Sequence, residues 1–347
     1  ADFNLVRKDD TTVVPLSGYV ATLRPGEGRF GGAVAVEEGT TNCIVSRDFE
    51  TWASYVTGNA TGTVEFRQDP IYGKVVKLKK TDGGSGRFGL KGTLSGLSGS
   101  IYTHSVYVRA LSGTGRIACM YVDAAKTGGG LITSQNYRNL SDLPLGQWVR
   151  IATAIDGSPD TLAGGGSVYV WVDTDNGECE FAYPQVEAKP FATSFVDGTR
   201  AAGVLTYDAS IMPVQSATVA AWVWVPPSSH WPTTSWRRII SNANDFAART
   251  IALYLSPTDR KLYLELSDNS NTRQTISSPS SVAEGWHHVV ATWDASRMAL
   301  YVDGSLVAQK PSPSLPTSHP YSWIAVGSRT DDMDHLNGLI DELLILP

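Results

Sequence analysis

The stretch WHHVVATWDASRMALYVDGSLVA, residues 286–308, decides the fold. One strand candidate begins at Trp286 and ends before Asp294, and a second, MALYV, reverses at Asp303-Gly304 into SLVA. Asp-Gly between apolar runs favours a hairpin, because both residues tolerate the positive φ of a type I′ turn. The stretch therefore predicts an antiparallel β-meander.

A similar pattern lies upstream. WVRIATAID (residues 148–156) is followed by a glycine-rich loop, by VYVWVD (residues 168–173) and by an Asn176-Gly177 turn into ECEFAY. The two tryptophan-led strands start 138 positions apart. Such a repeat in a chain of 347 residues predicts two domains with similar strand layouts, each large enough to bury a core.

Composition agrees with a fold of many short strands. The chain has 33 glycines and 18 prolines, and only 18% of its residues are charged, which suits strands joined by tight turns. Helical periodicity does not extend beyond one or two turns. We expect an extended N-terminal arm over residues 1–40, a first domain over 41–195 and a second over 196–347. An isolated hairpin is marginal in water, so the arm should pack on the body or on another subunit.

Charge and hydropathy exclude two classes of partner. The formal net charge is −6 and the positive residues are scattered, which argues against nucleic acid. Apolar runs stay well below the length of a membrane span, so no membrane insertion is expected.

The three cysteines Cys43, Cys119 and Cys179 lack metal-type spacing. One disulfide is compatible with them, but packing of all three as small apolar residues is favoured.

The first domain resembles a carbohydrate-binding-module jelly roll. The resemblance lies in DFETW (residues 48–52), YTHSVYVRA (residues 102–110), the tryptophan-led strand at Trp148 and AYPQVEAKPFATSF (residues 182–195). The last of these is also similar to sequences common in bacteriophage tail and virion-surface proteins.

The second domain resembles a laminin G-like or concanavalin A-like sandwich. Its motifs follow in order: TVAAWVWV, RIISNAN, IALYLS, KLYLELSD, the meander, SWIAVGSR and GLIDELLIL. The two resemblances imply an all-β protein of two antiparallel β-sandwich (jelly-roll) domains in tandem, whose strands bury one face and expose the other.

The sequence predicts a protein that is not an enzyme. Laminarinase-like hydrolases of this architecture carry Glu-x-Asp-x-x-Glu on one strand, and that motif does not occur here. His287 and His288 are adjacent on a strand and point to opposite faces, so they cannot share a metal. The sequence also has no Gly-x-Ser-x-Gly motif.

Calcium is the expected cofactor, in a structural role. Carboxylate and carbonyl oxygens at loop-strand junctions suit it, and both resembled families often hold a structural calcium near the joined ends of the sandwich. In the second domain the resemblance implies Asp341 as a ligand, with Asp208 as its neighbour. Glu50 and Glu187 are the weaker equivalents in the first domain. The alternative, that these carboxylates hydrogen-bond turns, stays open for all four.

Aromatic side chains in loops are the candidate glycan contacts, because an aromatic face stacks on the apolar face of a sugar ring. Trp148, Trp222, Trp286 and Trp293 follow strand patterns and are assigned mainly to packing. The candidates in loops or at strand ends are Trp231, Trp236, Tyr321 and Trp323 in the second domain and Tyr121 and Tyr137 in the first. Exposed aromatics also serve subunit interfaces, which is the alternative for each.

The function predicted from these patterns is non-catalytic recognition. We expect an extracellular or virion-surface protein, of the tail or adhesion type, whose partner is a glycan or cell-surface polysaccharide. A first alternative is a virion decoration or assembly subunit that contacts copies of itself or other virion proteins. A second is a polysaccharide hydrolase or lyase with an unrecognised site.

Overall fold

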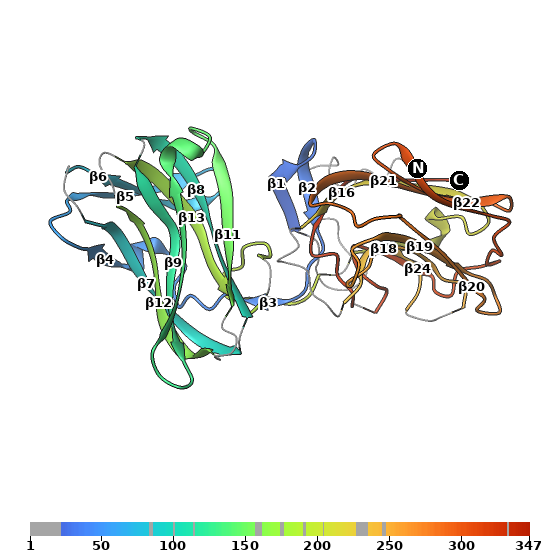
Figure 1. Cartoon of the computed structure of the whole chain (residues 1–347), viewed down its shortest axis with the longest axis horizontal. Helices are drawn as coiled ribbons and strands as arrows, with labels where there is room; N and C mark the ends of the chain where they lie inside the picture. Colours follow the sequence, from blue (N-terminus) through green and yellow to red (C-terminus); the bar gives the residue numbers. More distant parts are fainter. Residues whose placement is uncertain are drawn as a thin grey trace. The chain divides into compact units, whose positions relative to one another are not determined.

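The protein is built from β-strands. The structure, a computed structural model, describes residues 22–82, 86–99, 101–113, 115–156, 162–173, 177–189, 192–203, 205–226, 235–244, 248–331 and 333–347. Within these ranges the only helical segments are the 3-10 turns η1 (Phe49–Thr51), η2 (Leu140–Asp142) and η3 (Ala209–Ile211). The predicted all-β class with antiparallel sheets is confirmed (Figure 1). Among the described residues, no helix has the length and apolar character needed to cross a membrane.

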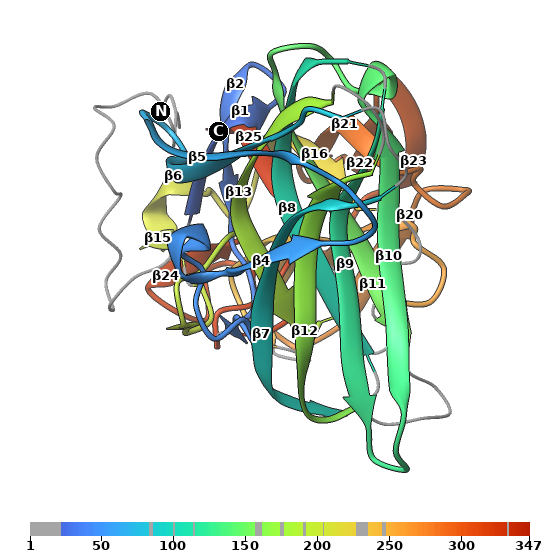
Figure 2. The ribbon, with the colours of Figure 1, turned by 90° about the vertical axis from the view of Figure 1, so that its left-hand side faces the viewer.

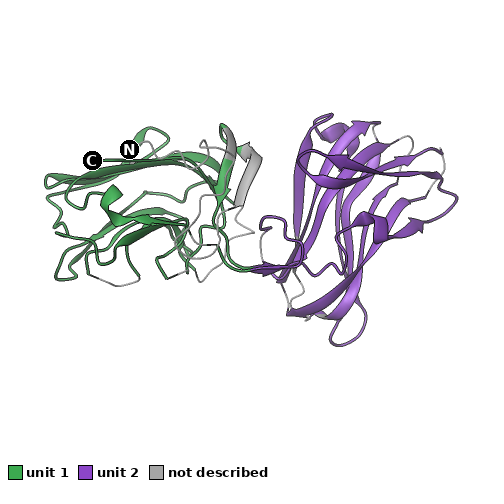
Figure 3. Ribbon diagram, turned by 180° about the vertical axis from the view of Figure 1, so that it is seen from behind, with its two compact units in different colours: residues 1–39, 201–347 green, residues 40–200 purple. Residues whose placement is uncertain are grey.

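The chain forms two compact units (Figure 3). Unit 1 comprises Ala1–Gly39 and Ala201–Pro347, and unit 2 comprises Thr40–Arg200. Unit 2 is thus inserted between two segments of unit 1. The segment predicted as an N-terminal arm is grouped with the second sandwich, so the two units do not follow one another simply along the sequence.

Unit 2 contains two five-stranded sheets, named here after one strand of each. The β12 sheet has the order β10-β9-β12-β7-β4 and consists of β4 (Ala53–Val56), β7 (Phe88–Gly99), β9 (Arg116–Lys126), β10 (Leu131–Asn139) and β12 (Leu162–Val172). The β8 sheet has the order β11-β8-β13-β6-β5 and consists of β5 (Gly62–Asp69), β6 (Gly73–Lys80), β8 (Ile101–Ser112), β11 (Trp148–Asp156) and β13 (Glu178–Glu187). A short ladder joins β3 (Thr40–Thr41) to β14 (Thr199–Arg200), where the chain enters and leaves the unit.

The core of unit 2 draws alternate residues from both sheets. Val106 and Val108 of β8 and Val168 and Val170 of β12 are buried in one apolar cluster. Successive residues of a strand point to opposite faces, so the residues between these valines lie on the outer faces of the sandwich.

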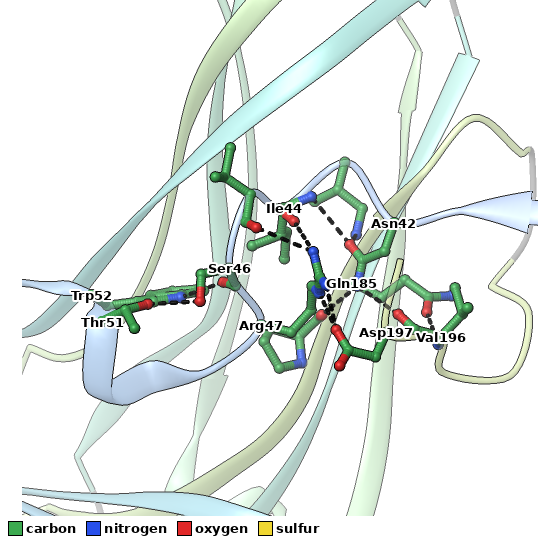
Figure 4. Close-up of polar contacts among 12 residues, drawn as sticks. Asn42, Ile44, Ser46, Arg47, Thr51, Trp52, Gln185, Val196 and Asp197 are labelled. Carbon is green, nitrogen blue, oxygen red and sulfur yellow. Dashed lines mark hydrogen bonds and ion pairs between the residues drawn. The ribbon is translucent and has the colours of Figure 1, made fainter. Parts of the chain in front are cut away.

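Side-chain amides tie the two ends of unit 2 together (Figure 4). The Asn42 amide oxygen accepts from the backbone N–H of Val186 at 3.1 Å. The Gln185 amide oxygen accepts from the N–H of Val196 at 2.8 Å. Buried backbone N–H groups need such acceptors where the ladders end. These hydrogen bonds therefore connect strand β13 to the segments through which the chain enters and leaves the unit.

The three cysteines are buried and free. Burial, the main cause, raises the pKa of Cys43 to about 11 and that of Cys119 to about 12, so both thiols stay protonated at neutral pH. Packing is confirmed, and the alternative of one disulfide is not realised for Cys43, Cys119 or Cys179.

Unit 1 is also a two-sheet sandwich. The seven-stranded β16 sheet has the order β1-β2-β25-β16-β21-β22-β23 and consists of β1 (Thr22–Gly28), β2 (Gly31–Ala35), β16 (Ala217–Val225), β21 (Gly285–Trp293), β22 (Arg297–Val302), β23 (Ser305–Pro311) and β25 (Leu339–Leu346). The six-stranded β18 sheet has the order β15-β24-β17-β18-β19-β20 and consists of β15 (Thr206–Asp208), β17 (Arg237–Ser241), β18 (Ile251–Leu255), β19 (Leu262–Ser267), β20 (Arg273–Ser277) and β24 (Trp323–Val326).

The meander predicted for residues 286–308 is confirmed as β21, β22 and β23. Asp303 and Gly304 connect β22 to β23 with φ of +51° and +79°, the signs that a type I′ turn requires. The Asp303 carboxylate also accepts from the backbone N–H of His288 at 2.9 Å, which fixes the turn to β21. The second predicted turn includes Asn176, which lies outside the described residues.

The N-terminal segment completes the core of unit 1. Strand β2 pairs with β25 through Val34 and Ile340, and Val34 and Val36 are buried in the unit 1 core. The carbonyl of Glu37 then accepts from the N–H of Gly203 at 2.6 Å. Of the two alternatives predicted for the arm, its described part shows packing on the body.

Removing residues 1–39 is expected to destabilise unit 1 and to leave unit 2 unchanged. Burying two valines stabilises by roughly 3 kcal/mol. The melting temperature of unit 1 should therefore fall by about 6 to 12 °C, as measured by calorimetry on residues 40–347 against the whole chain. The double variant Val34→Ala/Val36→Ala keeps the strand pairing and should show about half this fall or more. An unchanged unit 1 transition in both proteins would contradict the assignment.

Unit 2 should lose stability as the pH falls below about 6.5, the ordinary pKa of histidine. His104, the only histidine among residues 40–200, is fully buried, and burial lowers its pKa to about 3. Between pH 6.5 and pH 3 this histidine is protonated in the unfolded state and neutral in the folded state. Its contribution to the free energy of unfolding is therefore complete above pH 6.5 and is lost progressively toward pH 3. At pH 5 the loss should be about 2 kcal/mol. The free energy of unfolding of unit 2, measured between pH 7 and pH 5, should depend less on pH in the His104→Gln variant than in the natural protein. An equal pH dependence in both proteins would contradict the assignment to His104.

Candidate functional site

The outer face of the β12 sheet carries a cluster of aromatic side chains. In β12, Val168, Val170 and Val172 point into the core, so Tyr169 and Trp171 lie on the outer face. Figure 2 shows this sheet face on, with β4, β7, β12, β9 and β10 side by side. The outer face therefore receives side chains from five strands.

One cross-strand row on this face alternates large and small residues. Strand register places Tyr55, Gly89, Trp171, Ala118 and Tyr137 across β4, β7, β12, β9 and β10. A Cβ at Gly89 would lie 2.7 Å from the Cβ of Trp171, closer than real Cβ atoms approach. Glycine and alanine on either side of the tryptophan thus leave the room that its indole ring occupies.

The next row adds two more rings. Register places Tyr169 beside Tyr121, with Lys91 on its other side. The Tyr121 ring lies 4.8 Å from that of Trp171, and the centroids of Tyr55 and Tyr169 are also 4.8 Å apart. Tilted pairs at such distances are favourable aromatic contacts. We call Tyr55, Tyr121, Tyr137, Tyr169 and Trp171 the aromatic platform.

The platform has a buried centre and an accessible rim. Trp171 is 0% exposed and Tyr169 8% exposed, whereas Tyr55, Tyr121 and Tyr137 are half-buried and present part of each ring to solvent. Among the described residues, the Nε1–H of Trp171 meets no acceptor.

Positive charges border the platform. The guanidinium of Arg87 lies 4.7 Å from the Trp171 ring centroid, and that of Arg116 lies 4.5 Å from the Tyr137 ring. The Lys91 ammonium lies 5.5 Å from the ring of Tyr169. Each distance is within the range of a cation–π contact.

The opposite border is polar and rich in hydroxyl groups. Register places Thr93, Ser167, Asp123 and Thr133 in one row across β7, β12, β9 and β10. The Thr133 hydroxyl donates to Asp123 at 2.7 Å. Burial, the largest cause, raises the pKa of Tyr121, so its hydroxyl stays protonated at neutral pH. Donors and acceptors are thus available beside the rings.

The sequence predicted two members of this platform. Tyr121 and Tyr137 were candidate glycan contacts, and the structure brings them together around Trp171. Tyr55, Tyr169 and Trp171 were missed. The signal for the last two was present in VYVWVD, where valines at every second position leave Tyr169 and Trp171 on the other face.

The candidates in unit 1 lie at separate places. The ring of Trp236 meets that of Tyr254 edge-on at 5.1 Å, beside β17. Tyr321 and Trp323 stack on each other at 5.7 Å, at the start of β24. Trp231 lies outside the described residues. Each described candidate is half-buried against another aromatic ring.

Of the four tryptophans assigned to packing, only Trp293 lies in the interior, where it is buried in the unit 1 core. Trp148, Trp222 and Trp286 are half-buried on outer faces, where Trp148 and Trp286 pack against small buried apolar clusters. Trp222 contacts His288 across the strand pair at 5.3 Å. Packing therefore describes Trp148 and Trp286 as well, on an outer face of the sheet and not in the interior.

The two carboxylates predicted to bind calcium in unit 1 accept hydrogen bonds from the backbone. Asp341 accepts from the N–H groups of Phe30 at 3.0 Å and Glu342 at 2.9 Å. Asp208 caps η3 by accepting from the N–H of Ser210 at 2.9 Å. Asp208 thus hydrogen-bonds a turn, as the alternative describes, whereas Asp341 also joins strand β25 to Phe30, 311 positions away.

The two carboxylates predicted in unit 2 also have protein partners. Glu50 pairs with Lys74 at 3.0 Å. Glu187 is fully buried and accepts from the Thr40 hydroxyl at 2.7 Å, from the Gln185 amide at 2.6 Å and from the N–H of Thr193 at 2.8 Å.

Each unit holds two of the four carboxylates. Within the described ranges, no three or more His, Cys, Asp or Glu side chains are grouped to hold a metal ion. The structural calcium and its four carboxylate ligands stay a prediction.

Comparison with known proteins gives one family match. The model of the concanavalin A-like lectin/glucanases superfamily, of the laminin G type, matches residues 197–347. This confirms the resemblance predicted for the second domain, and it covers less than half of the chain. No curated protein matches the sequence.

Solved structures resemble about two fifths of the chain. A family 11 carbohydrate-binding module from Clostridium thermocellum, in complex with a β-1,3-1,4-mixed-linked tetrasaccharide, is 14% identical over 43% of this chain and 95% of its own, with a TM-score of 0.32. The CBM40 module of a Ruminococcus gnavus sialidase, bound to α2,3 sialyllactose, is 14% identical over 41% and 83%, with a TM-score of 0.33.

A third structure is the enzymatically active domain of tailspike protein 4 from bacteriophage CBA120. It is 15% identical over 42% of this chain, with a TM-score of 0.33, and the match spans 21% of the tailspike chain. Likeness at this level does not identify the ligand or role of the present chain.

Replacing Glu187 by glutamine should destabilise unit 2 by about 1 to 3 kcal/mol, because an NH₂ group would face donors in a buried site. Glu50→Gln, at a half-exposed carboxylate, should change stability by no more than about 1 kcal/mol. Thermal unfolding with and without a calcium chelator is the measurement. A chelator effect on the natural protein that vanishes in Glu187→Gln would show instead that this carboxylate binds calcium.

Proposed function

We propose that unit 2 binds glycan on the outer face of the β12 sheet. The observation that carries the proposal is the aromatic platform, in which three half-exposed tyrosines surround a buried tryptophan. The C–H groups of a sugar ring form an apolar face that packs on aromatic rings, and flanking polar groups fix its hydroxyls. Tyr121 and Tyr137, with Asp123 and Thr133 nearby, supply both kinds of contact.

The platform suits reversible binding. Its rings are held by one another before any ligand arrives, so little side-chain freedom is lost on binding. An open sheet face buries less of a ligand than a closed pocket does, which limits affinity. We expect dissociation constants of roughly 1 μM to 1 mM for short oligosaccharides.

The proposal is binding without catalysis. In the described part of this face, Asp173 is engaged with Arg116 and Asp123 with Thr133. A glycosidase needs one carboxyl group free to donate a proton and another to attack or to activate water. Incubation with bound glycans should therefore release no new reducing ends or unsaturated products.

A setting on a virion surface or tail, and a role as decoration or assembly subunit, remain predictions from the sequence. The β16 and β18 sheets of unit 1 carry their own half-exposed aromatics, such as Trp222 and Trp236, which suit either a ligand or a neighbouring subunit. Light scattering on the whole chain would separate these roles, since an assembly subunit should form oligomers.

A glycan array probed with the whole chain is the direct test. Tyr121→Ala and Tyr137→Ala should each weaken binding about 3- to 10-fold, the value of one aromatic contact. Tyr72→Ala is the matched control, because Tyr72 is a half-buried tyrosine that stacks on Trp148 beside the other sheet of the same unit. Binding that is lost in Tyr72→Ala and kept in the platform variants would contradict the proposed face, and an empty array would contradict glycan binding.

A further inference from the structure

The charges around the aromatic platform specify the class of glycan. We propose that this face binds an anionic saccharide, one that carries a carboxylate or sulfate group, an inference that rests on the proposed glycan binding. The shared chemistry is an anion attached to a pyranose ring that stacks on tyrosine.

The first step is the placement of the cations. Arg87 and Arg116 flank Trp171 and Tyr137 at one border of the platform, and Lys91 stands in the row of Tyr169. All three cations come from strands or strand ends of the β12 sheet, so the sheet holds their backbone positions fixed. Arginine in particular presents a planar fork that matches carboxylate and sulfate oxygens.

The second step is the local charge balance. One carboxylate, Asp173, stands among these three cations; it accepts from Arg116 Nε at 3.0 Å, and its side chain is 9% exposed. The border of Arg87 and Arg116 therefore keeps an excess of one positive charge, and Lys91 adds a second in the row of Tyr169, in a chain of net charge −6. Such a reversal of sign over a small area attracts an anion.

The third step is accessibility. Lys91 is exposed, and within the described ranges no carboxylate lies within ion-pair distance of its ammonium group. Arg116 pairs with Asp173, but 48% of its side chain remains exposed. Both cations can therefore meet a ligand without breaking the contacts that hold the platform together.

The fourth step is orientation. Arg87 and Arg116 lie on one side of the tyrosine rings, and the row of Asp123 and Thr133 lies on the other. Lys91 lies between these two borders, in the row of Tyr169. An anionic sugar stacked on Tyr121 and Tyr137 would direct its charged group toward Arg116 and its hydroxyls toward Asp123. The opposite orientation would place two negative charges together, which costs binding energy.

The alternative is that the three cations only cover the rings and take no part in recognition. Matched lysine variants separate the two cases. Lys91→Gln removes the unpaired charge from the face, and Lys79→Gln removes the same charge from β6, in the β8 sheet of unit 2. Both substitutions leave the aromatic platform intact.

The experiment measures affinities of the whole chain for matched saccharides by calorimetry. The pairs are an oligogalacturonate with its carboxyl-reduced form, and a heparin-derived hexasaccharide with its desulfated form. At least one acidic member should bind about fivefold or more tightly than its neutral counterpart, and the preference should shrink as ionic strength rises from about 50 to about 300 mM. The pair that shows the preference identifies carboxylate or sulfate as the source of the charge.

The variants then locate the effect. Lys91→Gln should reduce the preference about two- to fivefold, and Lys79→Gln should leave it unchanged. Three outcomes would contradict the proposal of an anionic ligand without contradicting glycan binding. They are equal affinity within both pairs, equal effects of the two lysine variants, and binding of neutral array glycans while neither acidic member binds. Failure of all four saccharides together with an empty array contradicts both proposals.

Discussion

Alternation along the strands is the constraint on which the rest of the structure depends. Each sheet must bury one face to form a sandwich, so every second residue of a strand points into the core and the residues between them point outward. In β12 the residues that point into the core are Val168, Val170 and Val172. The intervening Tyr169 and Trp171 are free of the core, and a sheet five strands wide gathers similar residues beside them.

The platform shows how such an outer face becomes a specific surface. Trp171 is too large to lie beside other large residues in its row, and Gly89 and Ala118 solve this by being small. Tyr55, Tyr121 and Tyr137 pack on the indole in tilted contacts and expose only part of their rings. The site is therefore rigid because its support is buried, although it lies on an open face.

The sequence predicted the all-β class, the central meander and two of the platform tyrosines, because these depend on local patterns. Turn chemistry at Asp303-Gly304 and periodicity of two act over a few residues. Membership of the platform depends on register between strands far apart in the chain, as for Tyr55 and Tyr137, and no local pattern carries that information. The packing of residues 22–39 in unit 1 could not be predicted for the same reason, since β2 pairs with β25, which lies some 300 positions later in the chain.

The predicted calcium ligands illustrate a second limit. A carboxylate at a strand junction can satisfy backbone N–H groups or bind a cation, and both roles use the same residue at the same place. Asp341 meets two N–H groups, and Glu187 is surrounded by hydroxyl, amide and N–H donors that the entering and leaving segments supply. In a buried site those donors stabilise the negative charge of the carboxylate. Identifying the role therefore requires the partners, which only the fold brings together.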